Sequence, residues 1–485
     1  MIKVSFDNEN ITVNAQRGAT ALDAARQGGV YLASPCGGNG TCGKCQVAIN
    51  GETVLACCTP LSCDCIISTS ATADQTLQIV SSGHSTAHAL NPHYNNGYGL
   101  VVDIGTTTLV VSLCDLATGT KVATESLLNP QTQYAQDVIS RIQFAGQNDG
   151  LSALHTTLTK SLNAAIARLT AQIGIAPRDI KDAIYSGNTV MLHLAVGADP
   201  TPLGKYPYTP NITGGCYFPA RKLNIGGEIY MPPIVSPFVG ADIACGILAC
   251  DLTQTTATTL FIDIGTNGEM VLAKDGNLVA TSTAAGPAFE GMNISQGKRA
   301  SIGAIERFAF NDDDTITIET IGNTDANGIC GSGLLDIVAA LVRTGRVDST
   351  GRFSDKSNAF TITPHVSLTQ GDIRQVQLAK GAIRAGIDAM LDRLSLTPQD
   401  IERVEIAGSF GYHVSERSLL QLKMLPAAFA GKIYFVGNTS QSGGMALLLN
   451  TDLRRDVERM VQEVKHIDFG NDEAFDDLFV ENLGF

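Results

Sequence analysis

The strongest constraint on the fold is a β-meander that occurs twice in the chain. LVVDIGTTTLVVSLCDLATGTKVA spans residues 100–123, and LFIDIGTNGEMVLAKDGNLVA spans residues 260–280. Each copy contains an apolar run, an Asp-Ile-Gly-Thr turn, a second apolar run, a polar turn with glycine and a third strand. In both copies a carboxylate ends a buried strand, and the Gly-Thr turn lets backbone N–H groups and hydroxyls approach a polyphosphate. The repeat therefore predicts a phosphate clamp between two half-domains.

Composition narrows the classes of protein to which the chain can belong. Of its 485 residues, 44% are hydrophobic and 16% are charged, which is typical of a globular chain with large buried sheets. The formal net charge of −14 argues against nucleic acid as a partner. The start lacks the basic and apolar regions of a signal peptide, and the longest uncharged apolar stretch, residues 229–241, is too short to span a bilayer. We therefore expect a cytoplasmic protein with no membrane partner.

Seven of the twelve cysteines lie between Cys36 and Cys65. The segment PCGGNGTCGKC places Cys36, Cys42 and Cys45 at C-x5-C-x2-C spacing among four glycines. Glycine-rich backbone can curl round a metal cluster and direct N–H groups at its sulfurs. A disulfide framework is expected in a much smaller secreted chain, and zinc prefers paired C-x2-C units, of which only one is present. The pattern therefore favours an iron–sulfur site, with structural zinc as the alternative.

A hairpin brings a fourth cysteine into reach of the other three. Two short strand-like runs flank Asn50-Gly51, the preferred pair for a two-residue type I′ turn, so Cys45 and Cys57 are expected at the same end of the hairpin. Cys57 is therefore the predicted fourth ligand. Cys58 is expected on the opposite face of a strand, although the choice between the two stays open. The other two thiols of this region are interpreted as spare: Cys63 and Cys65.

The cysteine loop resembles that of plant- and adrenodoxin-type ferredoxins, which bind a two-iron, two-sulfur cluster. Residues 3–15 read as a hairpin and residues 20–28 as a short helix, which fits the β-grasp pattern of such ferredoxins. The chain departs from them in having only 11 residues between the third and fourth ligands. The resemblance implies a 2Fe–2S cluster on four thiolates: Cys36, Cys42, Cys45 and Cys57.

The chain divides into a small domain, a linker and a duplicated body. Residues 1–70 form the predicted iron–sulfur domain, and residues 71–98, rich in Ser, Thr, Asn and Gly, suit an exposed linker. The α/β body spans residues 99–485. We expect its first lobe at residues 99–245 and its second at 246–470, with an acidic tail that forms a final helix on the body.

Three glycine-containing loops follow the paired turns in the sequence. AGPAFEGMN, ICGSGLLDIV and VEIAGSFG each place glycines between a strand and a helix, where bare backbone lets a nucleotide approach. The segment GMNISQGKRA is not a P-loop, because it has one residue too many between its glycines and Arg299 stands where Ser or Thr should be. Nucleotide binding is therefore predicted to depend on the duplicated scaffold. The loop residues expected to contribute are Gly286, Gly331, Ser332, Gly333, Gly408, Ser409 and Gly411.

The paired DIGT turns, the small-residue helix in PFVGADIACGIL and the late AGSFG loop resemble the superfamily of acetate and sugar kinases, Hsp70 and actin. The closer resemblance is to the reductive activators of corrinoid enzymes. SGNTVMLHLAVGADPTPLGKYPY, STAAGPAFEGMNI and GICGSGLLDIV carry it, and it covers most of residues 100–440. It implies an α/β fold, in which a small β-grasp, ferredoxin-like α+β domain precedes a duplicated, RNase H-like, two-lobed ATPase.

This resemblance also implies that the clamp binds ATP with Mg²⁺. Asp103 and Asp263 would hold the metal, and Asp242 on the inter-lobe helix, or Asp263, would orient the attacking water. For Asp242 the alternative is a carboxylate that satisfies free amides at a helix N-terminus. The expected clamp residues are those of the two turns: Asp103, Gly105, Thr106, Thr107 and Thr108, with Asp263, Gly265, Thr266 and Asn267.

The implied activity is ATP-dependent return of inactive cobalt(II) to cobalt(I) in a corrinoid protein of a methyltransferase system. Electrons would pass through the iron–sulfur cluster from an upstream low-potential donor, and a homodimer is left open. Because this transfer is uphill for an ordinary ferredoxin, nucleotide must change the affinity of the protein for one cobalt state. Two alternatives stay open, namely an ATP-dependent electron activator of another low-potential enzyme and a small-molecule kinase with an iron–sulfur domain.

Overall fold

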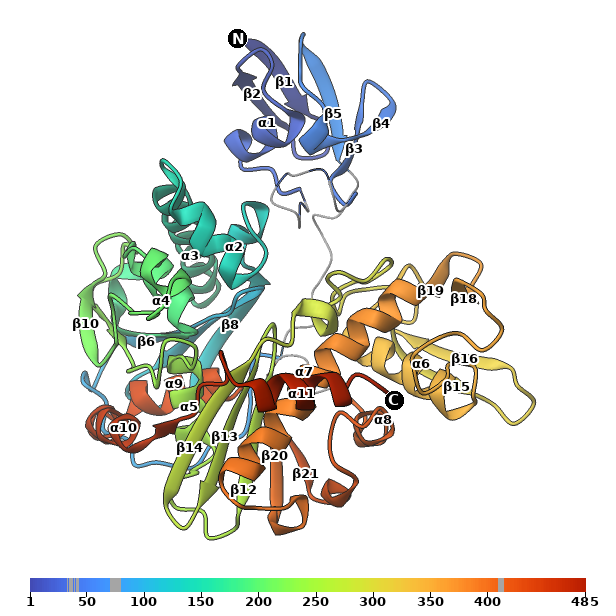
Figure 1. Cartoon of the computed structure of the whole chain (residues 1–485). Helices are drawn as coiled ribbons and strands as arrows, with labels where there is room; N and C mark the ends of the chain where they lie inside the picture. The colour runs from blue at the N-terminus through green and yellow to red at the C-terminus, as the bar shows by residue number, and fades with distance from the viewer. Residues whose placement is uncertain (33, 35–37, 39, 41–42, 70–79, 409–413) are drawn as a thin grey trace.

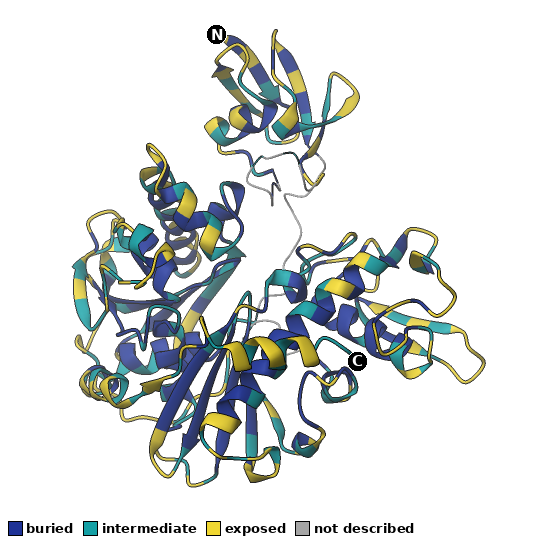
Figure 2. Cartoon of the chain, viewed as in Figure 1, coloured by how far each residue is buried: buried dark blue, intermediate teal, exposed yellow. Residues whose placement is uncertain are grey.

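The computed structural model describes residues 1–32, 34, 38, 40, 43–69, 80–408 and 414–485. A small N-terminal domain stands above a larger body, which consists of two lobes and a peripheral subdomain (Figure 1). Buried residues line the strands of the sheets and the helix faces that cover them (Figure 2). Among the described residues, no helix is both long and apolar enough to cross a membrane.

The N-terminal domain is a five-stranded mixed sheet of order β2-β1-β5-β3-β4, against which α1 packs. Helix α1 begins with a capping box, because the side chain of Thr20 accepts from the Asp23 amide and Asp23 accepts from the Thr20 amide. Asn50 and Gly51 have φ of 52° and 94°, as a type I′ turn requires. The predicted β-grasp pattern is thus confirmed: β1 Ile2–Phe6, β2 Ile11–Ala15, α1 Ala21–Gly28, β3 Gln46–Ile49, β4 Glu52–Leu55 and β5 Cys65–Thr69.

The first lobe is built on the first predicted meander. Strands β6, β7 and β8 pair antiparallel, and β6 also pairs parallel with β9, so the sheet has the order β10-β11-β9-β6-β7-β8. Its strands are β6 Tyr98–Ile104, β7 Thr108–Asp115, β8 Lys121–Leu128, β9 Ile180–Gly187, β10 Cys216–Pro219 and β11 Glu228–Met231. Its helices are α2 Val138–Ala145, α3 Gly150–Ile173 and α4 Thr189–Val196.

The second lobe repeats five strands of this topology and adds its sixth strand at the opposite edge, which confirms the predicted duplication. Its sheet has the order β21-β20-β12-β13-β14-β22, with β12, β13 and β14 as the meander and β20 parallel to β12. The sheet strands are β12 Thr259–Ile264, β13 Gly268–Lys274, β14 Asn277–Thr283, β20 Arg403–Ala407, β21 Ile433–Gly437 and β22 Lys465–His466. Helix α7 (Gln370–Arg393) packs on β13 and β14 of this sheet. The peripheral elements are β15 Ala304–Phe310, β16 Ile316–Thr320, β17 Gly328–Ile329, α6 Gly331–Arg343, β18 Ala359–Thr363, β19 Val366–Thr369 and α8 Glu416–Gln421.

Two helices join the lobes at their base. Helix α5 (Ala241–Ala249) crosses α9 (Thr439–Leu449) so closely that a Cβ on Gly443 would lie 2.1 Å from the carbonyl oxygen of Cys245. Helices α9 and α10 (Asp452–Glu463) lie in sequence between β21 and β22 of the second-lobe sheet but pack on the first lobe. There, Arg454 of α10 forms a buried ion pair of 2.5 Å with Asp182 of β9. The chain therefore returns to the first lobe after β21 and then comes back to the second-lobe sheet at β22.

The acidic tail forms helix α11 (Glu473–Glu481), which lies across α7 (Figure 1). The side-chain amide of Gln377 donates to the carbonyl oxygen of Leu483 at 2.9 Å, and the buried Lys380 ammonium donates to that of Gly484. These hydrogen bonds tie the end of the chain to the second lobe.

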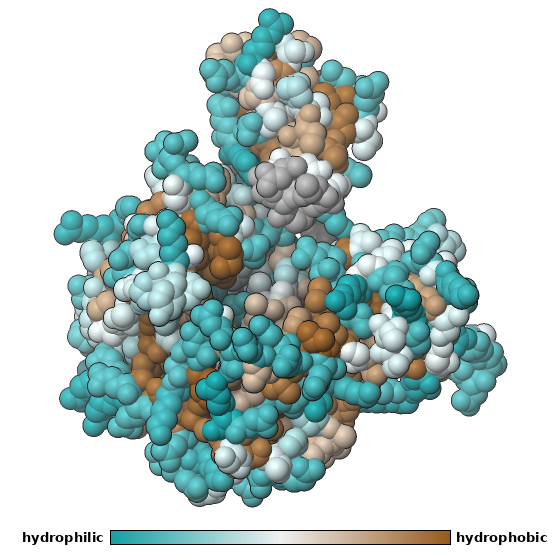
Figure 3. Space-filling view, viewed as in Figure 1, coloured by the Kyte–Doolittle hydropathy of each residue, from teal (hydrophilic) through white to brown (hydrophobic). Residues whose placement is uncertain are grey.

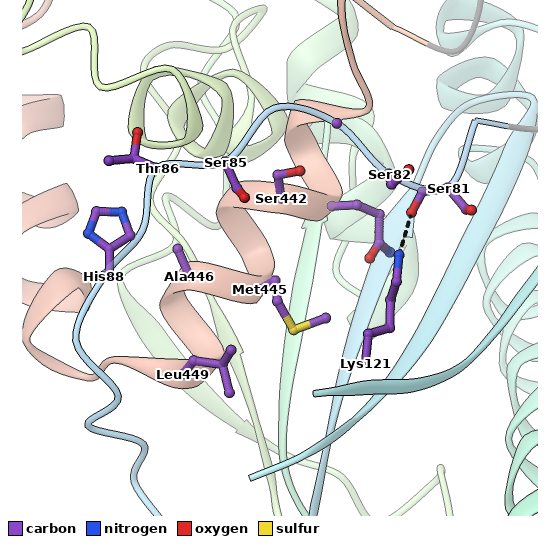
Figure 4. Close-up of a pocket in the computed structure, with 12 residues that line it drawn as sticks. Ser81, Ser82, Ser85, Thr86, His88, Lys121, Ser442, Met445, Ala446 and Leu449 are labelled. Atoms are coloured by element: carbon purple, nitrogen blue, oxygen red, sulfur yellow. Dashed lines mark hydrogen bonds between the residues drawn. The ribbon is translucent and has the colours of Figure 1, made fainter. Parts of the chain in front are cut away.

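The segment between the two domains is exposed over most of its described length, but it is attached to the body. His84 donates its backbone amide to the carbonyl oxygen of Val436 at 2.7 Å, and Asn91 donates to that of Leu449 at 2.8 Å. A cavity of about 260 Å³ lies between residues 81–88 and α9, where Lys121 reaches the carbonyl oxygen of Ser81 (Figure 4). Residues 80–97 therefore run along the surface of the body and are held to it by hydrogen bonds.

Candidate functional site

The two DIGT turns face each other across a cavity of about 100 Å³. Strands β6 and β9, and likewise β12 and β20, run parallel and bring their carboxyl ends to this cavity, where ligands bind in open α/β sheets. The space-filling view shows a hollow between the lobes below the N-terminal domain (Figure 3). Of the predicted residues, the cavity is lined by Asp103, Gly105, Thr106, Thr107, Thr108, Asp242, Asp263, Gly265, Thr266, Asn267 and Gly408.

Other predicted residues lie elsewhere. Gly286 precedes the 3-10 turn Pro287–Glu290, and Gly331, Ser332 and Gly333 begin α6. A Cβ on Gly333 would lie 2.1 Å from the carbonyl oxygen of Ile305, so this glycine permits close packing of α6 on β15. None of these four is among the described residues that line the cavity. Ser409 and Gly411 lie outside the described residues.

Asp103 is held by two donors from the start of α9. The amide of Asn438 donates to its Oδ2 at 2.8 Å, and the hydroxyl of Ser440 donates to its Oδ1 at 2.7 Å. Ser440 in turn contacts the hydroxyl of Ser186 on β9 at 2.8 Å. Burial raises the pKa of Asp103, and the hydrogen bonds from Asn438 and Ser440 lower it in part. The carboxylate is thus oriented before any ligand arrives.

Asp242 and Asp263 share the cavity with Asp103. Burial, followed by the charges of Asp263 and Asp103, raises the pKa of Asp242 to about 8. Burial, followed by the charges of Asp103 and Glu290, raises the pKa of Asp263 to about 7. Asp242 Oδ1 also accepts the amide of Ile243 at 3.0 Å at the start of α5, so it contacts a helix N-terminus and lines the cavity as well. Such clustered carboxylates call for a cation that relieves their mutual repulsion.

Five polar lining residues were missed by sequence reasoning: Asn188, Glu269, Glu290, Asn438 and Ser440. A sequence signal existed for the two asparagines, because Gly-Asn-Thr follows a strand and opens a helix in both lobes, at residues 187–189 and 437–439. Each asparagine caps its helix, and Asn188 donates to the hydroxyl of Thr106 at 2.9 Å. Glu269 stands two positions beyond the second turn, and burial raises its pKa well above the ordinary value.

Glu290 joins the two turns directly. The hydroxyl of Thr107 in the first turn donates to its Oε2, and the hydroxyl of Thr266 in the second turn donates to its Oε1 at 3.0 Å. The asparagine Asn129 holds the first turn from behind, because its Nδ2 donates to the carbonyl oxygen of Gly105 at 2.8 Å. Both turns are therefore fixed by side chains from other segments.

The carboxylates, amides and hydroxyls that line the cavity fit a divalent cation with a polyphosphate. Its lining includes five carboxylates, and no lysine or arginine is found among the described lining residues. Hard cations such as Mg²⁺ prefer carboxylate oxygens, and Gly-Thr turns offer amides and hydroxyls to phosphate. The five carboxylates belong to Asp103, Asp242, Asp263, Glu269 and Glu290.

The cysteine site lies at the end of the N-terminal domain that faces the body. Cys45 Sγ and Cys57 Sγ are 3.2 Å apart, so the hairpin brings them together. Cys58 was expected on the opposite face of a strand, and this was wrong. Cys57 and Cys58 lie in a 3-10 turn, Ala56–Cys58, and their sulfur atoms are 3.6 Å apart. The other two predicted ligands, Cys36 and Cys42, lie outside the described residues.

The described thiols fit part of a cluster site. Burial raises the pKa of Cys45 and of Cys57, so both are protonated thiols unless a metal takes them as thiolates. The backbone amide of Gly40 hydrogen-bonds to Cys57 and lowers its pKa in part, as an N–H donor to a cluster sulfur would. Cys65 is buried on β5 and Cys63 is exposed before it.

Three family models match the chain in succession. Residues 4–66 match the 2Fe-2S iron-sulfur cluster binding domain, residues 98–255 match the RACo middle region, and residues 257–485 match the C-terminal domain of RACo, the ASKHA domain. ASKHA denotes the superfamily of acetate and sugar kinases, Hsp70 and actin. The boundaries of these matches coincide with the N-terminal domain and with the two halves of the body.

Two curated relatives and one solved structure are similar to most of the chain. Corrinoid activation enzyme RamQ of Eubacterium limosum is 29% identical over 419 residues, which cover 80% of this chain and 70% of the relative. The [Co(II) methylated amine-specific corrinoid protein] reductase of Methanosarcina barkeri is 24% identical over 424 residues, which cover 80% and 77%. The solved reductive activator for corrinoid,iron-sulfur protein superposes with a TM-score of 0.75 at 28% identity, over 100% of this chain and 98% of that one.

Proposed function

Because the chain belongs to the family of reductive activators of corrinoid proteins, we propose that it uses ATP to return cobalt(II) of a corrinoid protein to cobalt(I). One observation carries the proposal. The same chain has two Asp-Ile-Gly-Thr turns across a cavity lined by carboxylates, and two thiols with sulfur atoms 3.2 Å apart on a domain that contacts the body. A nucleotide site alone would not need a cluster-binding domain, and a cluster-binding domain alone would not need a nucleotide site.

In this proposal the two turns receive the phosphates of ATP. The backbone amide of Gly105 and the hydroxyls of Thr106, Thr107 and Thr266 line the cavity as donors. The hydroxyls of Thr107 and Thr266 donate to Glu290, so a phosphate would have to take them from that carboxylate. Asp103 and Asp263 hold Mg²⁺, which supplies the positive charge that the lining lacks. Asp103 needs no reorientation, since Asn438 and Ser440 already fix its carboxylate.

Asp242 is the proposed acceptor of a proton from the attacking water. A divalent cation beside it would lower its pKa from about 8, so that the carboxylate becomes a base near neutral pH. Asp242 lies in the first turn of α5, and α5 packs against α9. A change at this carboxylate can therefore act on the two helices that join the lobes. Loss of the terminal phosphate would then allow the lobes to change their relative position.

Electron delivery is assigned to the N-terminal domain. Cys45 and Cys57, with Cys36 and Cys42, would hold a 2Fe–2S cluster, which supplies single electrons when bound. The names of the relatives support a corrinoid protein as the partner. An upstream low-potential donor, a cytoplasmic location and a homodimer are further parts of the proposal.

The test follows the visible spectrum of a cobalt(II) corrinoid protein mixed anaerobically with the reconstituted chain, a reductant and ATP. The cobalt(I) band is expected only when ATP is present. Cys45→Ser should abolish electron delivery and leave nucleotide binding intact, whereas Asp263→Ala should abolish nucleotide binding and leave the cluster intact. Asp325→Asn, on an exposed loop, is the matched control. Reduction that proceeds equally without ATP would refute the proposal.

A further inference from the structure

The N-terminal domain is attached to both lobes by basic residues beside its cysteine loop. Arg26 of α1 donates from Nε and Nη2 to the carbonyl oxygen of Gln133 in the first lobe, at 3.0 and 2.6 Å. Lys44 donates from Nζ to the carbonyl oxygen of Ser295 in the second lobe at 2.7 Å. Lys44 directly precedes Cys45, so its contact fixes the position of the proposed cluster ligand relative to the body.

The loop that Lys44 contacts begins at the cavity between the two DIGT turns, which is the proposed phosphate cavity. Glu290 ends the 3-10 turn Pro287–Glu290, and four residues separate it from Ser295. Ser295 is tied to α7, because its amide and its hydroxyl each donate to the carboxylate of Asp372 at 2.6 Å. Residues 291–295 are therefore a short connection with the cavity at one end and Lys44 at the other.

Glu290 uses the same hydroxyl donors that a phosphate would use. Its two carboxylate oxygens accept from Thr107 and Thr266, one from each turn. A carboxylate and a phosphate are both anionic acceptors, so they repel each other and compete for these hydroxyls. Gly286 and Gly291 stand at the two ends of the 3-10 turn with φ of 79° and 77°. Glycine tolerates changes of φ and ψ that other residues resist, so this turn can rotate as a unit.

We propose that Glu290 is a positioning residue that couples occupation of the phosphate cavity to docking of the N-terminal domain through Lys44. The inference rests on the proposed function, since it takes a nucleotide phosphate as the competing group. Phosphate on the threonine hydroxyls displaces the Glu290 carboxylate, and the short connection carries this displacement to the carbonyl oxygens of Ile294 and Ser295. Lys44 then loses its acceptors and, with the adjacent Cys45, is released from the second lobe, while Arg26 keeps its contact with the first lobe.

The first test measures affinity for a non-hydrolysable ATP analogue with Mg²⁺ by titration calorimetry on the full reconstituted chain. Glu290→Gln removes the competing charge and should tighten binding about tenfold, which corresponds to about 1.4 kcal/mol. Glu319→Gln, on exposed β16, is the matched control and should bind as wild type does. Weaker binding by the Glu290 variant would overturn the inference, because Glu290 would then be a ligand of the metal or phosphate.

The second test measures hydrogen–deuterium exchange in peptides covering residues 43–47 and 292–298. In the wild type the analogue should raise exchange severalfold in both peptides. Lys44→Met should keep the response of 292–298, lose the response of 43–47 and bind the analogue more tightly, because binding no longer has to break the Lys44 contact. Lys3→Met, at an exposed position of β1, should respond as wild type does. In Glu290→Gln, exchange should already be high without nucleotide.

The outcomes separate the coupling from the proposed function. Wild-type protein that binds the analogue but shows no change in residues 43–47 would overturn the coupling and leave the proposed function standing. A wild-type response that persists unchanged in Glu290→Gln would also overturn it. Wild-type protein that binds no nucleotide would refute the proposed function, and this inference with it.

Discussion

The side-chain amide of Asn438 donates a hydrogen bond of 2.8 Å to Oδ2 of Asp103, although the two residues lie 335 positions apart. Asn438 also caps α9, since its Oδ1 accepts the amide of Gln441 at 2.8 Å. The helix that crosses α5 is thereby tied to the first carboxylate of the clamp. A movement of α9 against the first lobe would disturb Asp103 directly.

Replacement of Asn438 by alanine should weaken magnesium-dependent nucleotide binding. Removal of a hydrogen bond to a buried charge typically costs about 1.5–3 kcal/mol, and here it also raises the pKa of Asp103 further. We expect affinity at pH 7 to fall about tenfold or more, because the buried carboxylate of Asp103 loses one of its two side-chain donors. Titration calorimetry measures this, with Asn277→Ala at the exposed start of β14 as control. Equal affinity in both variants would contradict the role of Asn438.

Stability without magnesium should fall as pH rises from about 4 to about 8. The folded protein holds protons on Asp263 up to about pH 7 and on Asp242 up to about pH 8, whereas the unfolded chain releases them near pH 4. The free energy of unfolding therefore decreases over this window by at most about 1.4 kcal/mol per pH unit for each group, and it levels off above it. Mg²⁺ favours the ionised carboxylates, so it should raise Tm more at pH 8 than at pH 6.

Thermal denaturation at a series of pH values, with and without Mg²⁺, measures this effect. Asp242→Asn should reduce the slope between pH 5 and pH 8, since one of the buried carboxyl groups with a raised pKa no longer titrates. Asp325→Asn, an exposed aspartate, should follow the wild-type curve. A magnesium effect on Tm that is the same at both pH values would contradict the predicted titration.

Cys57 and Cys58 should respond differently to replacement by serine. Cys57 lies 3.2 Å from Cys45 and is hydrogen-bonded by the amide of Gly40, whereas the neighbouring Cys58 is exposed. After anaerobic reconstitution, Cys57→Ser should lose most iron, acid-labile sulfide and visible absorption, and Cys58→Ser should retain them. The reverse result would make Cys58 the ligand, which its sulfur position 3.6 Å from Cys57 allows.

Gly443→Ala should push apart α9 and α5, the two helices that join the lobes. The added Cβ would meet the Cys245 carbonyl oxygen at 2.1 Å, and backbone cannot yield as a flexible side chain can. We expect a loss of about 3 kcal/mol in the free energy of unfolding, at the upper end of typical overpacking, together with weaker nucleotide binding. Denaturant unfolding measures the first and calorimetry the second. Gly371→Ala is the control, because its Cβ would meet only the Thr369 hydroxyl at 3.6 Å, and it should unfold as wild type does.

Sequence reasoning predicted the elements whose signals lie close together in the chain. The two meanders, the Asn50-Gly51 turn and the helix after Thr20 each depend on neighbours within a few residues, and each is present. The exception was Cys58, because strand alternation was assumed to continue where the chain closes a 3-10 turn. The matched family models confirm the resemblance on which the proposed function depends.

The sequence by itself determined that two DIGT turns and a cysteine loop exist, because periodicity, turn chemistry and ligand spacing are local properties of the chain. Only the tertiary structure decided that Asn438 would orient Asp103, that Glu290 would join both turns and that Lys44 would reach Ser295. Such contacts depend on how α9, the 3-10 turn before residue 291 and the N-terminal domain pack on distant elements. No local pattern specifies the distance between residues that the packing of the whole chain brings together.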